Sequence, residues 1–241
     1  FQAEDGIRDS VASRGLGDVY KRQSKDRTHS TLRCVILMSD HTSRQAFGLK
    51  ILNARHKEIR RLKREGYVAE IHGNKFWNSS FLIMDYLRQH PIPSSKKVLE
   101  IGCGWGLLGL FCSKKFSCRV HGIDADENVI PYLELHARVN NIKMTAEKKK
   151  FEQLSIAYLS QFDLILGADI CFWDEMTGVL LKLINRAKRS GVSTIMIADP
   201  CRAPFTDLAE RAKERYKEVS IVDKFLKKPV KATGEILIIK N

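Results

Sequence analysis

The residues best placed to do chemistry lie in the segment 98–109, VLEIGCGWGLLG, where an apolar run leads into closely spaced glycines. Gly102, Gly104 and Gly106 let the backbone turn tightly and approach a ligand closely. The residues after them predict a helix, whose first backbone N–H groups have no partner within the helix and can bind a ligand. A strand, a glycine turn and a helix start predict a site for a nucleotide-like cofactor.

Two acidic residues favour one cofactor class over another. Gly104 to Gly109 also fits the G-x-G-x-x-G pattern of dinucleotide sites. Glu100 stands two residues before the first glycine, where it would repel a pyrophosphate and attract a cationic amino group. Asp124 ends the next apolar run, 18 residues after Gly106, where its carboxylate can accept both hydroxyls of a ribose. The pair favours S-adenosyl-L-methionine, and an NAD-dependent oxidoreductase is the alternative from another class.

Apolar and amphipathic stretches alternate from residue 98 onward. They predict strands at 98–101, 119–123, 145–150, 163–167 and 192–198, and helices at 106–115, 127–140, 175–189 and 204–216, after an earlier helix at 78–90. Two last strands, 219–222 and 235–239, are separated by a short loop and must therefore pair antiparallel. The predicted fold is α/β: a Rossmann-like, seven-stranded, doubly wound sheet with a C-terminal antiparallel hairpin.

The N-terminal region divides into two parts. Residues 1–23 resemble translated sequencing-adapter read-through, which predicts a non-native leader, with Met38 as a candidate start and a genuine leader as the alternative. Residues 24–74 form an extension with a predicted basic helix at 42–66, whose apolar stripe is Leu52, Ile59 and Leu62. This helix either contacts RNA, the ribosome or an acidic protein, or exposes a solvated face.

The composition bounds the class of protein. The chain has 41 Lys and Arg against 28 Asp and Glu, and its net charge of +13 favours acidic partners. Its 44% hydrophobic content can fill one core. The apolar runs are far shorter than the ~18 residues of a membrane helix, so we expect no membrane span. Six isolated cysteines, without C-x-x-C or clustered histidines, predict a reduced cytoplasmic protein with no metal site.

From Lys75 to the C-terminus the sequence resembles the class I, seven-β-strand, S-adenosylmethionine-dependent methyltransferases, which implies a catalytic domain at 75–241. Within that superfamily it is most similar to the protein-lysine methyltransferases with a D-x-x-Y signature. Besides the glycine turn, three stretches carry the resemblance: KFW at 75–77, FDLILGADICF at 162–172 and ADPCR at 198–202. The chain departs from the signature at Phe172, where the family has tyrosine. A protein lysine is the expected methyl acceptor, and RNA or a small amine are the alternatives.

The resemblance implies substrate roles for residues beyond the fourth strand. Asp169 would stand over the cofactor and orient an amine, while Phe172 and Trp173 hold a methylammonium by cation–π attraction. Alternatively, Asp169 caps the helix near 174–176 and the aromatic pair belongs to the core. Arg202 either binds an acidic substrate or pairs with Asp199. A non-catalytic cofactor-binding regulator, in which Asp169 is dispensable, is a further alternative.

The resemblance also implies three cofactor contacts outside the glycine turn. Trp77 would close over the methionine part, or instead anchor the basic helix. Phe151 would stack on the adenine, or Glu152 would bind its exocyclic amine. Ala168, as a small residue beside Asp169, would lie against the cofactor.

Overall fold

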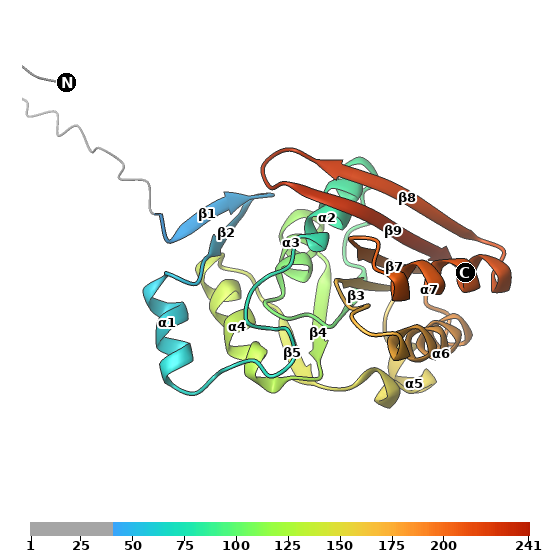
Figure 1. Cartoon of the computed structure of the whole chain (residues 1–241), viewed down its shortest axis with the longest axis horizontal. Helices are drawn as coiled ribbons and strands as arrows, with labels where there is room; N and C mark the ends of the chain where they lie inside the picture. Colours follow the sequence, from blue (N-terminus) through green and yellow to red (C-terminus); the bar gives the residue numbers. More distant parts are fainter. Residues whose placement is uncertain (1–40) are drawn as a thin grey trace, which may run out of the picture. The chain divides into compact units, whose positions relative to one another are not determined.

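The computed structural model describes residues 41–241, and its centre is a seven-stranded sheet (Figure 1). The strand order is β5-β4-β3-β6-β7-β9-β8, and the strands from β5 to β7 are parallel. β9 runs antiparallel to both β7 and β8. The strands are β3 (Lys97–Ile101), β4 (Arg119–Asp124), β5 (Thr145–Lys148), β6 (Leu164–Ala168), β7 (Thr194–Asp199), β8 (Val219–Leu226) and β9 (Ala232–Lys240).

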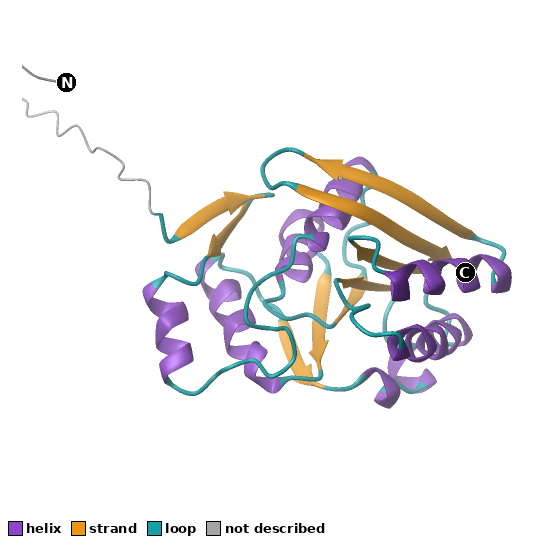
Figure 2. Cartoon of the chain, viewed as in Figure 1, coloured by secondary structure: helices purple, strands orange, loops and turns teal. Residues whose placement is uncertain are grey.

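Helices cover both faces of this sheet (Figure 2). One face carries α2 (Ser79–Gln89), α3 (Leu107–Phe116) and α4 (Ile130–Val139), and the other carries α5 (Ile156–Leu159), α6 (Glu175–Arg189) and α7 (Ala203–Arg215). Because successive strand residues point to opposite faces, Met196 packs in the first layer while Ile195 and Ile197 pack in the second. Each fully buried aliphatic side chain of this kind contributes about 1.5–3 kcal/mol.

The structure confirms the predicted fold and most of its elements. Two short 3₁₀ helices, Glu127–Val129 and Phe151–Gln153, precede α4 and α5. The C-terminal strands are longer than predicted, since they pair continuously from Val219 opposite Ile239 to Leu226 opposite Ala232. The predicted leader, Met38 and Cys34 lie outside the described residues.

The predicted basic helix is present only at its C-terminal end, and the predicted bounds of 42–66 are wrong. The region forms a hairpin of β1 (Ser43–Ala46) and β2 (Leu49–Leu52), followed by α1 (Lys57–Arg64). Phe47 and Gly48 have positive φ values of 51° and 78°, so they form a tight turn that a helix cannot contain. The α4 residue Asn140 also accepts from the backbone N–H of Lys50 at 2.8 Å and donates to its carbonyl at 2.9 Å, which stabilises β2.

The described residues bear on two further predictions. No helix within 41–241 is both long enough and apolar enough to cross a membrane. The five cysteines of this part of the chain carry free thiols, and four of them are buried. Burial raises the pKa of Cys103 and Cys112, so these thiols stay protonated and behave as small apolar groups.

Candidate active site

The glycine turn between β3 and α3 has the backbone that its sequence predicts. Gly102, Gly104 and Gly106 have φ values of 61°, 50° and 70°. A Cβ on Gly102 would lie 2.6 Å from Ile170, and one on Gly106 would lie 2.5 Å from Leu133. At Gly104 nothing lies within 4 Å of the added Cβ, so this position faces open space. The turn therefore needs glycine for its conformation, and packing adds to that need at both ends.

Glu100 is buried at the carboxyl end of β3, beneath the start of α3. Its Oε2 accepts a hydrogen bond from the backbone N–H of Gly109 at 3.0 Å. Burial raises the pKa of Glu100 to about 8, because the ionised carboxylate is poorly solvated there. A buried acid of this kind, lining a cavity, is suited to a cationic ligand group that compensates its charge.

Asp124 at the end of β4 joins the glycine turn to the next loop. Its Oδ2 accepts from the N–H of Gly104 at 2.9 Å, and its Oδ1 accepts from the N–H of Asp126 at 3.0 Å. Burial raises its pKa from the ordinary value, although these two hydrogen bonds oppose the shift. The carboxylate keeps further acceptor positions for ligand hydroxyls.

Asp126 is a site residue that the sequence interpretation missed. It is buried, and its Oδ2 accepts from the backbone N–H groups of Glu70 and Ile71 at 2.6 and 3.2 Å. These bonds hold the segment 66–77, which we call the cleft segment, beside the glycine turn. Trp105 adds a bond from its Nε1 to the carbonyl of Gly73 at 2.9 Å. An Asp just before a predicted helix indicates an N-cap, and Asp126 does accept a hydrogen bond from the N–H of Asn128 at 3.0 Å. The residues around Asp126 in the sequence give no sign that it also binds the cleft segment.

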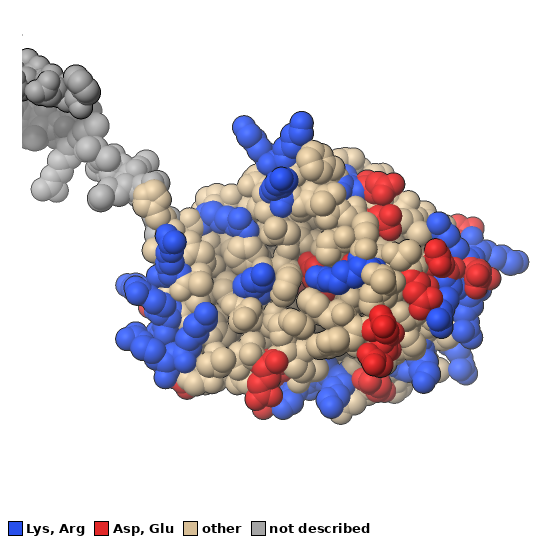
Figure 3. All heavy atoms as spheres, viewed as in Figure 1, with Lys and Arg blue, Asp and Glu red and all other residues tan. Residues whose placement is uncertain are grey.

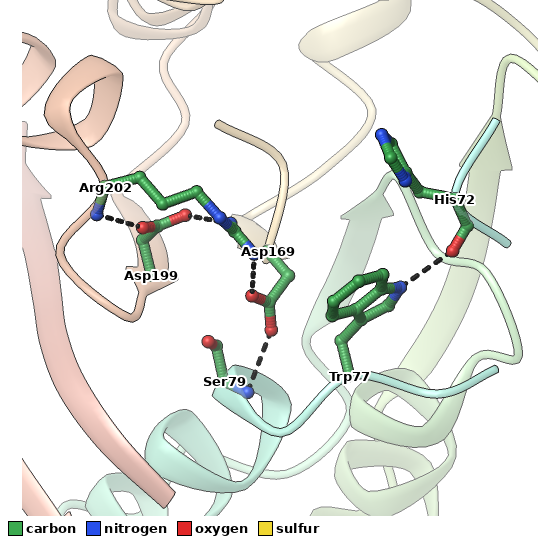
Figure 4. Close-up of polar contacts among 6 residues, drawn as sticks. All are labelled: His72, Trp77, Ser79, Asp169, Asp199 and Arg202. Carbon is green, nitrogen blue, oxygen red and sulfur yellow. Dashed lines mark hydrogen bonds and ion pairs between the residues drawn. The ribbon is translucent and has the colours of Figure 1, made fainter. Parts of the chain in front are cut away.

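Asp169 lies in a buried network of charges (Figure 4). Its Oδ2 accepts from the N–H of Ser79 at the start of α2 at 2.9 Å, and its Oδ1 accepts from Arg202 Nη2 at 3.0 Å. Arg202 Nη1 donates to Asp199 Oδ2 at 2.7 Å, so one guanidinium serves two carboxylates. Burial raises the pKa of Asp199 to about 6, against the opposing effect of Arg202. Asp169 therefore caps α2, and the alternative of a cap near 174–176 is wrong.

Of the two roles predicted for Arg202, binding an acidic substrate or pairing with Asp199, the structure shows the pairing with Asp199. It does not line the cavity but lies behind Asp169, with a side chain that is 24% exposed. Each oxygen of Asp169 accepts one hydrogen bond from the described part of the chain, so each retains a lone pair that can face the cavity.

The aromatic residues proposed for substrate binding differ in what their faces contact. The imidazole of His72 stacks on Phe172 with ring centroids 4.2 Å apart and an interplanar angle of 18°. The Arg202 guanidinium carbon lies 4.3 Å from the centroid of the same ring. Two flat groups at these distances must occupy opposite faces, so neither face of Phe172 is free to hold a methylammonium. Trp173, by contrast, is 48% exposed.

Trp77 comes from the cleft segment and leans against this stack. Its Nε1 donates to the carbonyl of His72 at 2.8 Å (Figure 4). Its ring lies edge-on to Phe172, with centroids 5.3 Å apart. Lys75 Nζ lies 4.2 Å from the centroid of the indole. The mouth of the cleft therefore combines aromatic surface with positive charge.

One cavity of about 250 Å³ brings most of the predicted site together. It is lined by every residue predicted for the cofactor, namely Trp77, Glu100, Gly102, Gly104, Gly106, Asp124, Phe151 and Ala168, and also by Asp169, Phe172 and Trp173. The cavity lies at the carboxyl ends of β3, β4 and β6, where open α/β sheets bind ligands. The residues present fit S-adenosylmethionine, because two acids can face its ammonium and ribose, and the three glycines of the turn line the cavity without bringing a side chain into it.

Comparison with solved structures identifies the fold. The methyltransferase domain of METTL16 matches with a TM-score of 0.55 over 83% of this chain and 86% of that one, at 13% sequence identity. The chain thus has the fold of S-adenosylmethionine-dependent methyltransferases. The sequence profile of the lysine methyltransferase family matches residues 56–214. The chain belongs to this family.

Individual relatives are similar over shorter stretches. The ubiquinone biosynthesis O-methyltransferase of Neisseria meningitidis is 30% identical over 114 residues, which cover 42% of this chain and 48% of that protein. A histidine protein methyltransferase 1 homolog of Dictyostelium discoideum is 36% identical over 120 residues, covering 47% of this chain and 37% of that protein. The chain therefore spans about half the length, or less, of these two curated relatives.

Proposed function

We propose that the chain transfers the methyl group of S-adenosylmethionine to a nitrogen of a protein side chain, with lysine as the leading acceptor. Membership of the lysine methyltransferase family is the observation that carries this proposal. The cavity supports it, since the glycine turn, Glu100 and Asp124 surround a single space. In this assignment Glu100 faces the ammonium of the cofactor and Asp124 its ribose.

Methyl transfer is an in-line displacement in which the sulfur–carbon bond breaks as the nitrogen–carbon bond forms. When bound, S-adenosylmethionine would supply the methyl group and would leave as S-adenosylhomocysteine, whose sulfur keeps the bonding electron pair. The acceptor nitrogen would release a proton to water. Proximity and orientation can account for ~7–11 kcal/mol of the barrier. The main task of the protein is to hold a neutral nitrogen against the methyl group and to exclude water.

Asp169 is the residue that we assign to orient the acceptor. It lines the cavity, and each of its oxygens keeps an acceptor position. Arg202, which is 3.0 Å from Asp169 and is shared with Asp199, offsets part of the negative charge. This weakens the preference of an amine bound to Asp169 for its ammonium form. Lys75, whose cation lies over Trp77, further disfavours a protonated acceptor at the mouth of the cleft.

Histidine is the second candidate acceptor. The match to a histidine protein methyltransferase homolog, at 36% identity, favours it. An imidazole with the usual pKa of about 6.5 is mostly neutral at pH 7, so it already offers a lone pair. Both acceptors use the same donor site, and they differ in how much deprotonation the site must assist.

The test has a binding arm and a transfer arm. We expect calorimetric titration to detect S-adenosylhomocysteine and not NAD, with weaker binding in Asp124→Ala. Labelled methyl groups supplied to unmethylated proteins and to RNA, followed by hydrolysis, then distinguish methyllysine, methylhistidine and methylated nucleotides. Asp169→Asn should lose most turnover and keep its affinity for S-adenosylhomocysteine. Binding of NAD alone, or cofactor binding without transfer to any acceptor, contradicts the proposal.

A further inference from the structure

Helix α1 carries four cations that have no acidic partner within residues 41–241. They are Lys57, Arg60, Lys63 and Arg64, all exposed, and they line one shallow surface depression. Arg61 on the same helix differs, because its Nε lies 3.2 Å from Glu58 and 3.7 Å from Glu65. Figure 3 shows basic side chains gathered over α1. We call Lys57, Arg60, Lys63 and Arg64 the α1 basic patch.

The chain between this patch and the cavity exposes apolar side chains. Tyr67, Val68 and Ile71 are 39%, 60% and 42% exposed, and they are three of the five large apolar residues with high exposure in the described part of the chain. Ile71 also lines the cavity. Asp126 fixes the backbone at Glu70 and Ile71, so the apolar side chains project from an ordered segment. We call Tyr67, Val68 and Ile71 the apolar strip.

The anchoring of α1 explains why its charges face outward. Ile59 and Leu62 are buried against Trp105, Tyr132 and Leu135, so the opposite side of the helix is left to solvent. The Tyr132 hydroxyl also donates to the carbonyl of Tyr67 at 2.5 Å, which ties the strip to the same support. The patch, the strip and the cavity mouth are thus held by one group of packed residues.

We propose that the α1 basic patch and the apolar strip together dock the substrate polypeptide, an inference that rests on the proposed function. The segment that fits has acidic residues for the patch and an aliphatic residue for the strip, placed beside the side chain that enters the cavity. Each exposed ion pair adds only ~0.2–1 kcal/mol, so the four cations act together to attract and orient the partner. Two of the three strip residues, Val68 and Ile71, are aliphatic and Tyr67 is the only aromatic one. This composition favours a polypeptide over single-stranded RNA, which binds by stacking successive bases on several aromatic faces.

The test measures binding separately from transfer. Two labelled peptides each carry a run of glutamates, a pair of leucines and one lysine, in the two possible orders, and a control peptide has glutamine for each glutamate. Fluorescence anisotropy gives their affinities for the full chain in the presence of S-adenosylhomocysteine. The patch variant is Arg60→Glu with Arg64→Glu. The matched control is Lys213→Glu with Arg215→Glu on α7. These two exposed cations also have no acidic partner among residues 41–241, and the net charge changes equally.

We expect one glutamate peptide to bind more tightly than the glutamine peptide, and the patch variant to lose at least about tenfold in affinity while the α7 variant keeps it. Val68→Ser should weaken both the glutamate and the glutamine peptide, because it removes apolar contact alone. Equal loss in the patch and α7 variants, no glutamate preference, or tight binding of oligouridine with none of either peptide would overturn the docking surface. Failure of methyl transfer to any protein, with peptide binding intact, would instead count against the proposed function.

Discussion

Arg202→Met should destabilise the fold in a pH-dependent way, because it removes the cation shared by two buried carboxylates. Arg202 lies 2.7 Å from Asp199 and 3.0 Å from Asp169, and these side chains are 0% and 3% exposed. Removing one partner of a buried ion pair costs about 3–5 kcal/mol, since the remaining charge loses both its water and its counterion. We expect a loss of that size in the free energy of unfolding near neutral pH.

The pH dependence follows from Asp199, whose pKa is raised from 3.8 to about 6. The folded state holds this proton more tightly than the unfolded state, so the contribution of Asp199 to stability falls as pH rises from 3.8 to about 6. Without Arg202 the pKa of Asp199 rises further, and the loss of stability continues above pH 6. The effect of Arg202→Met should therefore be smaller near pH ~5 than near pH ~7.5.

Urea unfolding at the two pH values measures this difference, with far-ultraviolet circular dichroism as the probe. Arg186→Met is the matched control, because Arg186 donates at 2.7 Å to the carbonyls of Leu154 and Phe151 and pairs with no acid within residues 41–241. Its cost should be the same at both pH values. An Arg202→Met cost that does not change with pH would refute the view that the two carboxylates bear the penalty.

Three further predictions concern the cleft. In the parent, calorimetry should find that the affinity for S-adenosylhomocysteine rises with pH below about pH 8, by up to ~1.4 kcal/mol per pH unit, because a ligand ammonium favours the ionised form of Glu100, whose pKa is about 8. Glu100→Gln should abolish this rise. Equal slopes in the parent and the variant would exclude contact between Glu100 and the ammonium. Asp126→Ala should speed amide hydrogen exchange at residues 70 and 71 and weaken cofactor binding, whereas unchanged exchange would show that the segment is held elsewhere. Gly106→Ala should lower the unfolding free energy by about 2–4 kcal/mol, since φ is 70° and the new Cβ lies 2.5 Å from Leu133; Gly178→Ala, with nothing within 4 Å, should not destabilise the fold.

The sheet and the glycine turn could be predicted because their signals are local. Alternating apolar strands, glycines before a helix and acids at strand ends each occupy a few consecutive residues, and parallel strand ends gather on one edge. The sequence does not predict the hairpin at 43–52, because the spacing of the charged residues across 42–66 is typical of a helix. The first residue of its turn, Phe47, also adopts a positive φ, which is uncommon for a residue other than glycine. Strand β2 of the hairpin is supported by Asn140, the residue that caps the C-terminal end of α4. A local sequence pattern gives no sign of a contact over that sequence distance.

The contacts around Asp169 could not be predicted for a related reason. Its carboxylate meets Ser79 and Arg202, which lie 90 and 33 residues away along the chain. The sequence suggested that Phe172 offers a free aromatic face, yet His72 and Arg202 cover both faces. Residues of the expected types that lie close together in the sequence are enough to locate the site. Which of its side chains bond to one another depends on how segments that are distant in the sequence pack together.

The cleft segment is held in place by a few side chains from other parts of the chain. This segment contributes Ile71, His72 and Trp77 to the cavity wall, yet within 66–77 it has no helix or strand and is tied down by Asp126, Trp105 and Tyr132. Segments held by a few side-chain bonds open far more often than sheets do. Opening of this wall therefore requires those bonds to break together, and under the proposed function the rate of that opening would set an upper limit on cofactor exchange along it.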